Sequence, residues 1–344
     1  MAIEIRRENI RRFVFSITLS TAFLFVFFVF SLSIGTSMIP YSEVLSCLFR
    51  IECGKLTEIL ISYRFTRSTT AMLTGALLAI SGTLMQSIAR NPLAEPYILG
   101  LSSTALTTLA IAIIVNPSVI ASRSLSMVIT FFGALGGYFL TSTLSLLAGG
   151  TSYSLILSGI AVTATFSGFS HILLYIVQSK IKSPYHLLLM GTSATAIAQD
   201  VYILLVVLAV GLIAIYTLGL PKKLNAYVFG DVFAKQLGYN PRVLSLLTAT
   251  LVSVLTGSSV AVVGIVGFIG LAAPHIARLL AGSSDHRITI VLSAILGSAI
   301  TVLADVGARL LAMVTAQGEF PLGSVTSVIG APFLAYLIIK GVKR

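Results

Sequence analysis

The sequence predicts an all-α protein that crosses a membrane many times. Of its 344 residues, 56% are hydrophobic and 10% are charged, whereas a soluble domain carries about 25% charged residues. The mean hydropathy is +1.01. Apolar runs of about 20 residues recur along the chain, each long enough for a helix to cross a hydrocarbon layer of about 30 Å. The runs lack the alternation of period two that marks transmembrane strands, so the sequence disfavours a barrel.

Ten spans are expected, within a single transmembrane domain over 1–344. Their approximate bounds are 13–34, 68–88, 98–115, 124–147, 154–177, 200–218, 243–262, 263–282, 289–308 and 322–340. The seventh and eighth form one apolar run that is too long for one crossing. We expect the chain to turn back where this run contains glycine and proline, at Gly264, Gly267, Gly270 and Pro274.

The first span has two interpretations, because the basic stretch "RRENIRR" precedes it. A cleaved signal peptide would begin in the same way. The apolar run is longer than the ~7–15 residues of a signal peptide core, and no clear A-x-A site follows it. The sequence therefore favours an uncleaved first helix over a cleaved signal.

The positive charges predict the orientation. With ten crossings and a cytoplasmic N-terminus, 14 of the 22 Lys and Arg residues lie on the cytoplasmic side, as the positive-inside rule requires. We therefore expect a cell-membrane protein with both termini in the cytoplasm. The net charge of +11 is explained by this topology and gives no reason to expect nucleic acid as a partner.

The chain lacks the motifs of membrane enzymes and of ATPases. Its one Gly-Lys pair, Gly54 and Lys55, is followed by leucine and has no upstream glycine, so it is not a P-loop. H-E-x-x-H and G-x-S-x-G motifs are absent as well. We expect no catalytic residues, no metal site and no bound cofactor. Cys47 and Cys53 fall in the first external loop and form either a local disulfide or two free thiols.

A polar segment at about 222–241 interrupts the apolar spans, and part of it reads "LNAYVFGDVFAKQLGYN" (224–240). Gly230 is expected to end one short helix and Asp231 to begin the next, with Gly238 as its stop. Asp231 and Lys235 have the spacing of an i,i+4 ion pair. Apolar anchors are expected at Val228, Phe229, Val232 and Phe233. Such a helix either docks into a groove on a partner or lies on lipid headgroups.

Five motifs in order resemble the FecCD-type permeases, the membrane subunits of ATP-binding-cassette (ABC) importers for iron-siderophores, haem and cobalamin. The family's cytoplasmic pattern LN-x-L-x-LGE-x-x-A-x-x-LG is matched by "LNAYVFGDVFAKQLG", with Asp231 in place of the usual glutamate. The other four are "RFTRSTTAMLTGALLAISGTLMQ", "RNPLAEPYILGLSSTA", "GFIGLAAPHIARLLAGSSDHR" and "FPLGSVTSVIGAPFLAYLI". The resemblance covers nearly the whole chain.

The resemblance implies a type II ABC importer permease fold and three sets of functional residues. The residues that couple to the ATPase would be Leu224, Asn225, Gly230, Asp231, Ala234, Leu237 and Gly238. Those that form salt bridges with an extracytoplasmic binding protein would be Arg64, Arg67 and Arg309. A cytoplasmic gate would lie at Thr151, Ser152, Tyr153 and Ser154. Headgroup contacts, an Asp305–Arg309 pair and an ordinary helix N-cap are the plainer alternatives for the last two sets.

The implied partners are a second copy of the chain, two cytoplasmic ATPase subunits that bind ATP, and a binding protein that delivers the substrate. The chain itself would perform no covalent chemistry. An ion-coupled secondary transporter, a passive channel and a membrane-embedded enzyme stay open as rival functions. The sequence leaves the substrate open among iron-siderophores, haem, cobalamin and an oxyanion.

Overall fold

The computed structural model describes all residues except 1, 36, 50–52, 182–189, 317–319 and 343–344. The described residues form 13 α-helices and one 3₁₀ helix, and no strand is found among them. In chain order, the helices are α1 (Ala2–Ser33), α2 (Tyr41–Leu48), α3 (Lys55–Ala89), α4 (Leu101–Val115), η1 (Pro117–Ala121), α5 (Arg123–Leu147), α6 (Ser152–Ile181), α8 (Ala198–Thr217), α9 (Leu220–Tyr227), α10 (Asp231–Gln236), α11 (Pro241–Val263), α12 (Ile269–Ala281), α13 (His286–Thr315) and α14 (Leu322–Val342).

The all-α membrane class is confirmed. Seven of these helices, α1, α3, α5, α6, α8, α11 and α13, are long and apolar enough to cross a membrane. Three shorter apolar helices, α4, α12 and α14, coincide with the three remaining predicted spans. The number of ten crossings stays a prediction. Large apolar side chains point outward at Phe15, Phe25, Ile172, Tyr175 and Ile213, as expected where the surrounding solvent is lipid.

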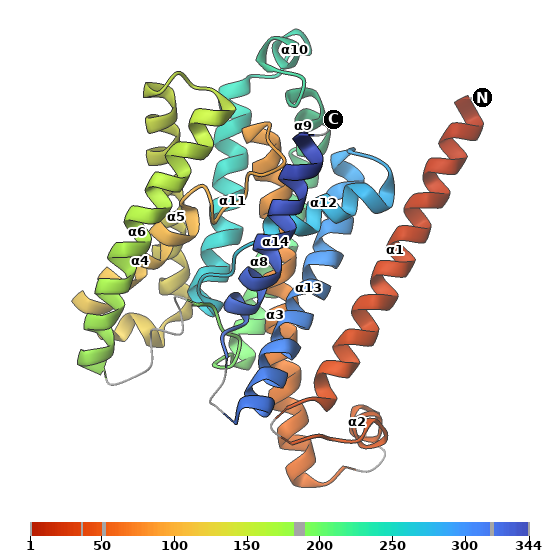
Figure 1. Ribbon diagram of the computed structural model, residues 1–344, viewed down its shortest axis with the longest axis vertical. Helices are drawn as coiled ribbons and strands as arrows, with labels where there is room; N and C mark the ends of the chain where they lie inside the picture. The colour runs from red at the N-terminus through yellow and green to blue at the C-terminus, as the bar shows by residue number, and fades with distance from the viewer. Residues whose placement is uncertain (1, 36, 50–52, 182–189, 317–319, 343–344) are drawn as a thin grey trace.

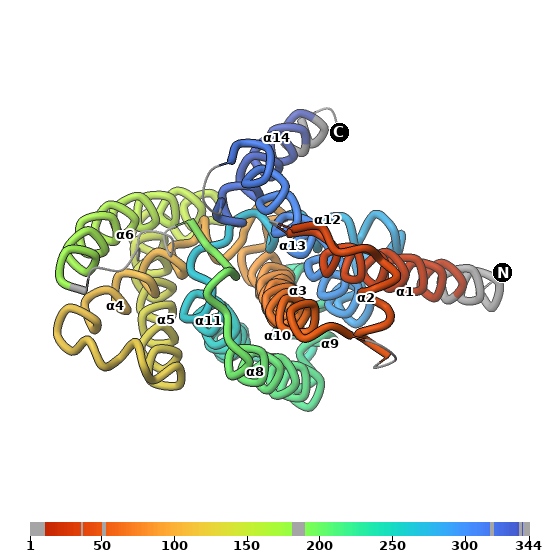
Figure 2. Tube along the Cα trace, turned by 90° about the horizontal axis from the view of Figure 1, so that it is seen from below, coloured from red at the N-terminus to blue at the C-terminus, as the bar shows by residue number. Residues whose placement is uncertain are grey.

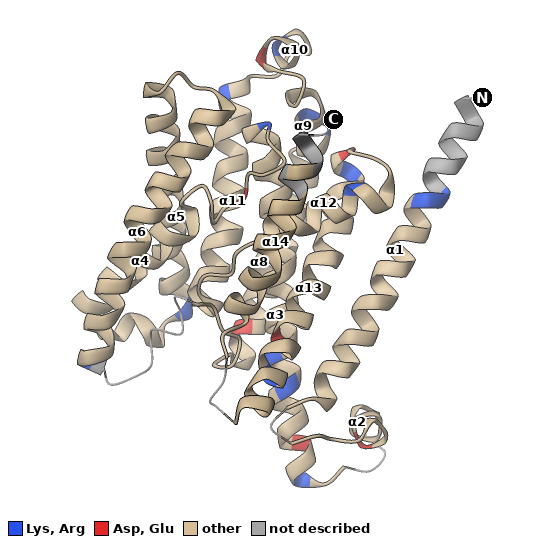
Figure 3. Ribbon diagram, viewed as in Figure 1, with Lys and Arg blue, Asp and Glu red and all other residues tan. Residues whose placement is uncertain are grey.

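The helices run up and down between two ends of the molecule (Figure 1). One end carries α9, α10 and both chain termini, and we call it the α10 end. The opposite end carries α2, and we call it the α2 end. Most charged residues gather near these two ends, and the middle of the bundle carries few (Figure 3). This distribution fits a multi-pass membrane protein, because charges are costly within the hydrocarbon layer. Of the basic residues used to predict orientation, Arg50, Lys182, Lys343 and Arg344 lie outside the described residues.

Helix α3 lies at the centre of the bundle, with α8, α11, α12 and α13 around it (Figure 2). Two glycine pairs allow its closest approaches. A methyl group on Gly75 would collide with the backbone of Gly297 in α13, and one on Gly82 would collide with Gly270 in α12. Small residues at such crossings let helix backbones pack together in a membrane, where van der Waals contact replaces the hydrophobic effect as the main attraction.

The turn between α11 and α12 uses only the first part of the stretch in which a break was expected. Residues 264–268 leave the helical conformation, with Gly264 and Phe268 at positive φ, but Gly270 and Pro274 lie inside α12. The predicted eighth span therefore starts too early. Glu95, which is 1% exposed, accepts a hydrogen bond from the Phe268 N–H at 3.1 Å. This acceptor holds the strained residue that begins α12.

At the α2 end, Cys47 and Cys53 are joined by a disulfide, with their Cα atoms 4.9 Å apart. The sequence had left this pairing open. A disulfide is typical of an oxidising compartment. It fits an α2 end that lies outside the cytoplasm.

Candidate functional site

Local chemistry explains why the polar segment folds into two short helices at the α10 end. Pro221 stands in the first turn of α9, where its missing N–H costs nothing. Gly230 separates α9 from α10 with φ of 114°, a conformation that side chains disfavour. Asp231 begins α10, where a negative charge complements the helix dipole. Gly238, with φ of 80°, follows its end. The expected division at Gly230 and Asp231 is therefore confirmed.

The segment presents some side chains to the outside and anchors others. Leu224 and Ala234 are fully buried and fix α9 and α10 to the bundle. Phe229 and Val232 are 76% and 72% exposed, although both are apolar. Further exposed apolar side chains on the segment are Val228, Phe233 and Leu237. We call these five exposed residues the α10 patch. Apolar side chains in water at the tip of a molecule typically mark a contact surface.

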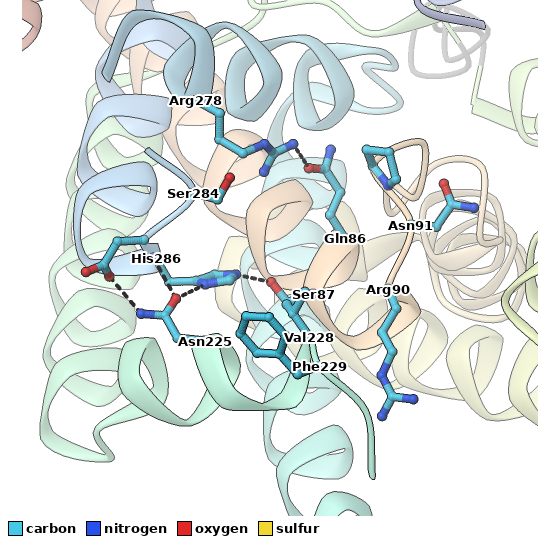
Figure 4. A pocket seen from close by; sticks show the side chains of 12 residues that line it. Gln86, Ser87, Arg90, Asn91, Asn225, Val228, Phe229, Arg278, Ser284 and His286 are labelled. Atoms are coloured by element: carbon cyan, nitrogen blue, oxygen red, sulfur yellow. Dashed lines mark hydrogen bonds between the residues drawn. The ribbon is translucent and has the colours of Figure 1, made fainter. Parts of the chain in front are cut away.

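An asparagine ties α9 to two other helices (Figure 4). The side-chain N–H of Asn225 donates to Asp285 at 2.8 Å, and its oxygen accepts from the backbone N–H of His286 at 3.0 Å. The same oxygen lies 2.5 Å from His286 Nδ1, which must carry the proton because the oxygen only accepts. The other ring nitrogen of His286 bonds to Ser87 of α3. We call these four residues the Asn225 junction.

Asp285 is the charged member of this junction and lies just before α13. Partial burial alone would raise its pKa. Hydrogen bonds from Asn225 and Arg287, together with the positive charge of Arg287, outweigh that effect and lower the pKa below its usual value. Asp285 is therefore ionised at neutral pH and accepts the Asn225 N–H as a carboxylate, which gives a stronger hydrogen bond than a neutral acceptor.

Arg90 contacts the α9–α10 segment, and sequence reasoning did not include it in the candidate site. It follows α3 with φ of 48°, in the left-handed region, close to the end at residue 88 that was predicted for the second span. Its guanidinium forms an ion pair with Asp231, donates to the Tyr227 carbonyl at 3.1 Å and lies 4.2 Å from the Tyr227 ring centre. The ion pair of Asp231 is thus made with Arg90, and the expected local pair with Lys235 is not the one formed. An exposed i,i+4 pair contributes only about 0.3–0.5 kcal/mol, so it is easily displaced by a cation that is already held in place.

A groove of about 420 Å³ opens beside the Asn225 junction. Its walls come from the end of α3, from α9, and from the α12–α13 connection. The lining residues are Gln86, Ser87, Arg90, Asn91, Pro92, Asn225, Val228, Phe229, Arg278, Ser284, Asp285 and His286. Figure 4 shows Arg278 and Gln86 on one side of it and Asn225 and His286 on the other. Polar side chains thus line a hollow at the base of the α10 patch.

The four residues of the expected gate form a helix start. The Ser154 N–H donates to Thr151 Oγ1 at 3.0 Å, and the Thr151 N–H donates to Ser154 Oγ at 2.9 Å. This reciprocal pattern is that of a capping box. Ser154 is buried and also bonds to Ser145 of α5 at 3.0 Å, Ser152 is partly buried, and Tyr153 is 73% exposed. The N-cap alternative describes Thr151 and Ser154, whereas Tyr153 is free to meet another surface.

The three arginines expected to dock a binding protein are buried at the α2 end. Arg64, Arg67 and Arg309 are 4%, 2% and 6% exposed. Arg67 and Arg309 pair with Asp305 at 2.9 and 2.6 Å, which confirms the Asp305–Arg309 pair. Arg64 donates to the carbonyls of Leu32 and Ser33 at 3.0 and 2.9 Å. All three line a small pocket of about 70 Å³. Their guanidinium groups are engaged inside the chain, and the salt bridges with a binding protein that the resemblance implied stay a prediction.

In the part of the chain that the structure describes, no group of three or more His, Cys, Asp or Glu residues is placed to hold a metal ion.

Comparisons with known proteins agree with the motifs. The profile of the FecCD transport family matches residues 23–340. The chain is 35% identical over 311 residues to the iron(3+)-hydroxamate import system permease protein FhuB of Bacillus subtilis, covering 89% of this chain and 78% of that protein. It is 35% identical over 288 residues to the hemin transport system permease protein HmuU of Yersinia pestis, covering 82% and 84%.

A solved structure of a metal-chelate type ABC transporter in an inward-facing conformation has the same fold. It superposes with a TM-score of 0.73 at 28% identity, and the match covers 93% of this chain and 97% of that one. The arrangement of helices described above is therefore that of an ABC importer permease. By its sequence profile and its relatives, the chain belongs to the FecCD transport family.

Proposed function

We propose that the chain is the membrane subunit of an ABC importer for a metal chelate and is driven by ATPase subunits that it does not contain. The observation that carries the proposal is the α9–α10 segment. This segment presents exposed apolar side chains at its tip, and it is tied through the Asn225 junction to α3 and α13. A transport subunit that is driven by a separate ATPase needs a surface that the ATPase can bind and that is connected to the central helices. Membership of the FecCD transport family supports the same function.

The ATPase subunits would bind the α10 patch from the cytoplasm. Phe229 and Val232 would then enter an apolar groove, in the manner of a helix-in-groove interface. ATP binding and hydrolysis in the partners would shift the α9–α10 segment between two positions, and the bundle would follow. This orientation places both termini in the cytoplasm.

A second copy of the chain would complete the translocation path. The exposed Tyr153, at the start of α6, supports an interface or a gate at this position, because its side chain is 73% exposed. Ser152 would join it, while Thr151 and Ser154 hold the helix start. The path itself would open between the two copies.

A binding protein would deliver the substrate at the α2 end. Its carboxylates would approach Arg64, Arg67 and Arg309 at their pocket, where they would compete with Asp305 and with the carbonyls of Leu32 and Ser33. Charge pairing of this kind sets the orientation and rate of association more than the affinity. The substrate class is proposed from the relatives, whose names specify ferric hydroxamate and hemin.

The test is reconstitution in proteoliposomes with the ATPase subunits and the binding protein. Uptake of radiolabelled ferric hydroxamate, ferric citrate or haem should require ATP and should stop with vanadate. Replacing Gly230 by Trp, or Asp231 by Lys, should lower substrate-stimulated ATP hydrolysis while the permease still assembles, because Gly230 has a φ of 114° and Asp231 pairs with Arg90. Uptake that ignores vanadate and collapses with ionophores would show an ion-coupled carrier instead.

A further inference from the structure

The groove at the base of the α10 patch contains an arginine, Arg278, that has no paired carboxylate among the residues that the structure describes. Two cations and one anion line this groove, namely Arg90, Arg278 and Asp285. Arg90 is paired with Asp231, and Asp285 is paired with Arg287. Among the described residues, no carboxylate forms an ion pair with Arg278. Within the described residues, the groove therefore holds one positive charge that no carboxylate neutralises.

Arg278 is partly buried, and among the described residues its side chain has one acceptor, Gln86. One N–H donates to Gln86 Oε1 at 2.5 Å, while a guanidinium carries five N–H donors in a fixed fork. Figure 4 shows the guanidinium in the groove wall, next to Gln86 and above Ser284. Arg278 lies in the last turn of α12, where the helix dipole favours a cation. The dipole accounts for the charge at this position but provides no acceptor for the remaining donors.

We propose that this groove is a docking pocket for an acidic side chain of the ATPase subunit, whose carboxylate pairs with Arg278. A carboxylate matches the guanidinium fork and accepts two parallel hydrogen bonds. Ser284 and the amide of Asn91 stand in the same walls and offer further polar contacts. The pocket differs from the α10 patch in chemistry, because the patch binds apolar side chains and the pocket binds a negatively charged one.

The position of the groove identifies its occupant. Val228 and Phe229 belong both to the α10 patch and to the groove wall. A protein that covers the patch must therefore also cover the mouth of the groove. Arg278 is partly buried in the free chain, and a partner that covers the mouth of the groove would strengthen a charge pair there, because the water that screens it would be removed. A lipid headgroup would satisfy the same guanidinium, but it would leave the exposed Phe229 uncovered.

The proposal rests on the proposed function and is tested by the affinity between the permease and its ATPase subunits. The permease is placed in nanodiscs of phosphatidylcholine, a lipid without net charge, and the binding of the ATPase is titrated at low and high salt. Arg278→Glu and Arg278→Gln should weaken binding by at least about 30-fold at low salt, the loss typical of one partner of a buried charge pair. Arg278→Lys should recover part of the loss, and the variants should show a weaker salt dependence than the wild type.

A control and a second variant separate the possible failures. Arg242→Glu makes the same charge change at an exposed position of the α10 end and should leave binding within about twofold. Phe229→Asp tests the patch. If Phe229→Asp abolishes binding and all Arg278 variants bind like the wild type, the docking pocket is refuted and the proposed function stands. If neither position matters, the proposed function fails.

The lipid alternative is an outcome of the same experiment. If Arg278→Glu affects binding only in nanodiscs that contain anionic phosphatidylglycerol, the groove holds a lipid phosphate and the proposal is overturned. If Arg278→Glu does not fold, Arg278→Gln and Arg278→Lys still carry the comparison. The strongest support would be an Asp→Lys or Glu→Lys change on the ATPase that restores binding to Arg278→Glu.

Discussion

Replacing Asn225 by alanine should disconnect ATP hydrolysis from transport. Asn225 donates to the carboxylate of Asp285 at 2.8 Å and accepts from the His286 N–H at 3.0 Å. A hydrogen bond to a charged group contributes about 1.5–3 kcal/mol, and a neutral one about 1 kcal/mol. Alanine removes both, so α9 loses about 2–4 kcal/mol of its connection to α13.

The Asn225 junction lies between the proposed ATPase surface and the helix bundle. The α10 patch, where the ATPase is proposed to bind, contains no member of the Asn225 junction, so ATP hydrolysis should persist. The bundle, however, can be shifted only by the free energy that α9 transmits to it. A loss of about 2–4 kcal/mol should lower the number of substrates moved per ATP by about tenfold or more. Proteoliposomes in which uptake and phosphate release are measured together give this ratio directly.

The matched control is Asn240→Ala. Asn240 lies a few residues after α10 and caps α11 by accepting from the N–H groups of Arg242 and Val243. Loss of this cap should cost about 1 kcal/mol of stability. The two capping contacts of Asn240 involve neither α3 nor α13. Equal transport ratios for Asn225→Ala and Asn240→Ala would refute the linkage. Asn225→Asp should be at least as harmful as alanine, because it sets an oxygen against the ionised Asp285.

Two further predictions concern the two ends of the molecule. Arg90→Ala should increase the rate of amide hydrogen exchange in α10 by about 10-fold. It removes the ion pair with Asp231 and the contact with Tyr227, which together contribute about 1–2 kcal/mol. An unchanged exchange rate would show that other contacts hold α10 in place. Asp305→Ala should lower the stability of the permease in chemical denaturation by about 3–5 kcal/mol, because it leaves Arg67 and Arg309 buried without their shared carboxylate. The control is Arg287→Ala, which removes the more exposed pair with Asp285 and should cost under about 1 kcal/mol.

The helices themselves could largely be predicted from the sequence, because their signals are local. Apolar runs mark the spans, and glycines with adjacent polar residues mark the ends of α9 and α10. The start of α12 could not be placed in the same way. Gly270 and Pro274 are residue types that often break helices, yet the chain turns at 264–268. There the side chain of Glu95, which is distant in sequence, accepts a hydrogen bond from the N–H of Phe268. Tertiary contact therefore decided which of several possible breaks was used.

The choice of ion-pair partners was the part that the sequence could not supply. Spacing suggested that Asp231 pairs with Lys235, and the family resemblance suggested that Arg64, Arg67 and Arg309 form salt bridges with a separate binding protein. The actual partners of Asp231 and Asp305 include Arg90 and Arg67, at separations of 141 and 238 residues. A local ion pair on a helix surface forms when no other charged side chain competes for either partner. Its prediction therefore requires knowledge of every other charge that the fold brings close. Two motifs expected on the same side of the membrane, "RNP" and "GD", were the available hint.

The same long-range contacts give the α10 end its mechanical character. The α9–α10 segment touches the bundle through two polar connections, one at Arg90 and one at Asn225, and both lead to the end of α3 or to its neighbour α13. Helix α3 continues through the centre of the bundle to Arg64 and Arg67 at the opposite end. A displacement of α9–α10 therefore acts on one helix whose far end lies beside the proposed docking surface. Since the close contact of Gly75 with Gly297 leaves α3 and α13 little room to slide independently, we expect the two helices to move together as the element that links the ATPase end to the substrate end.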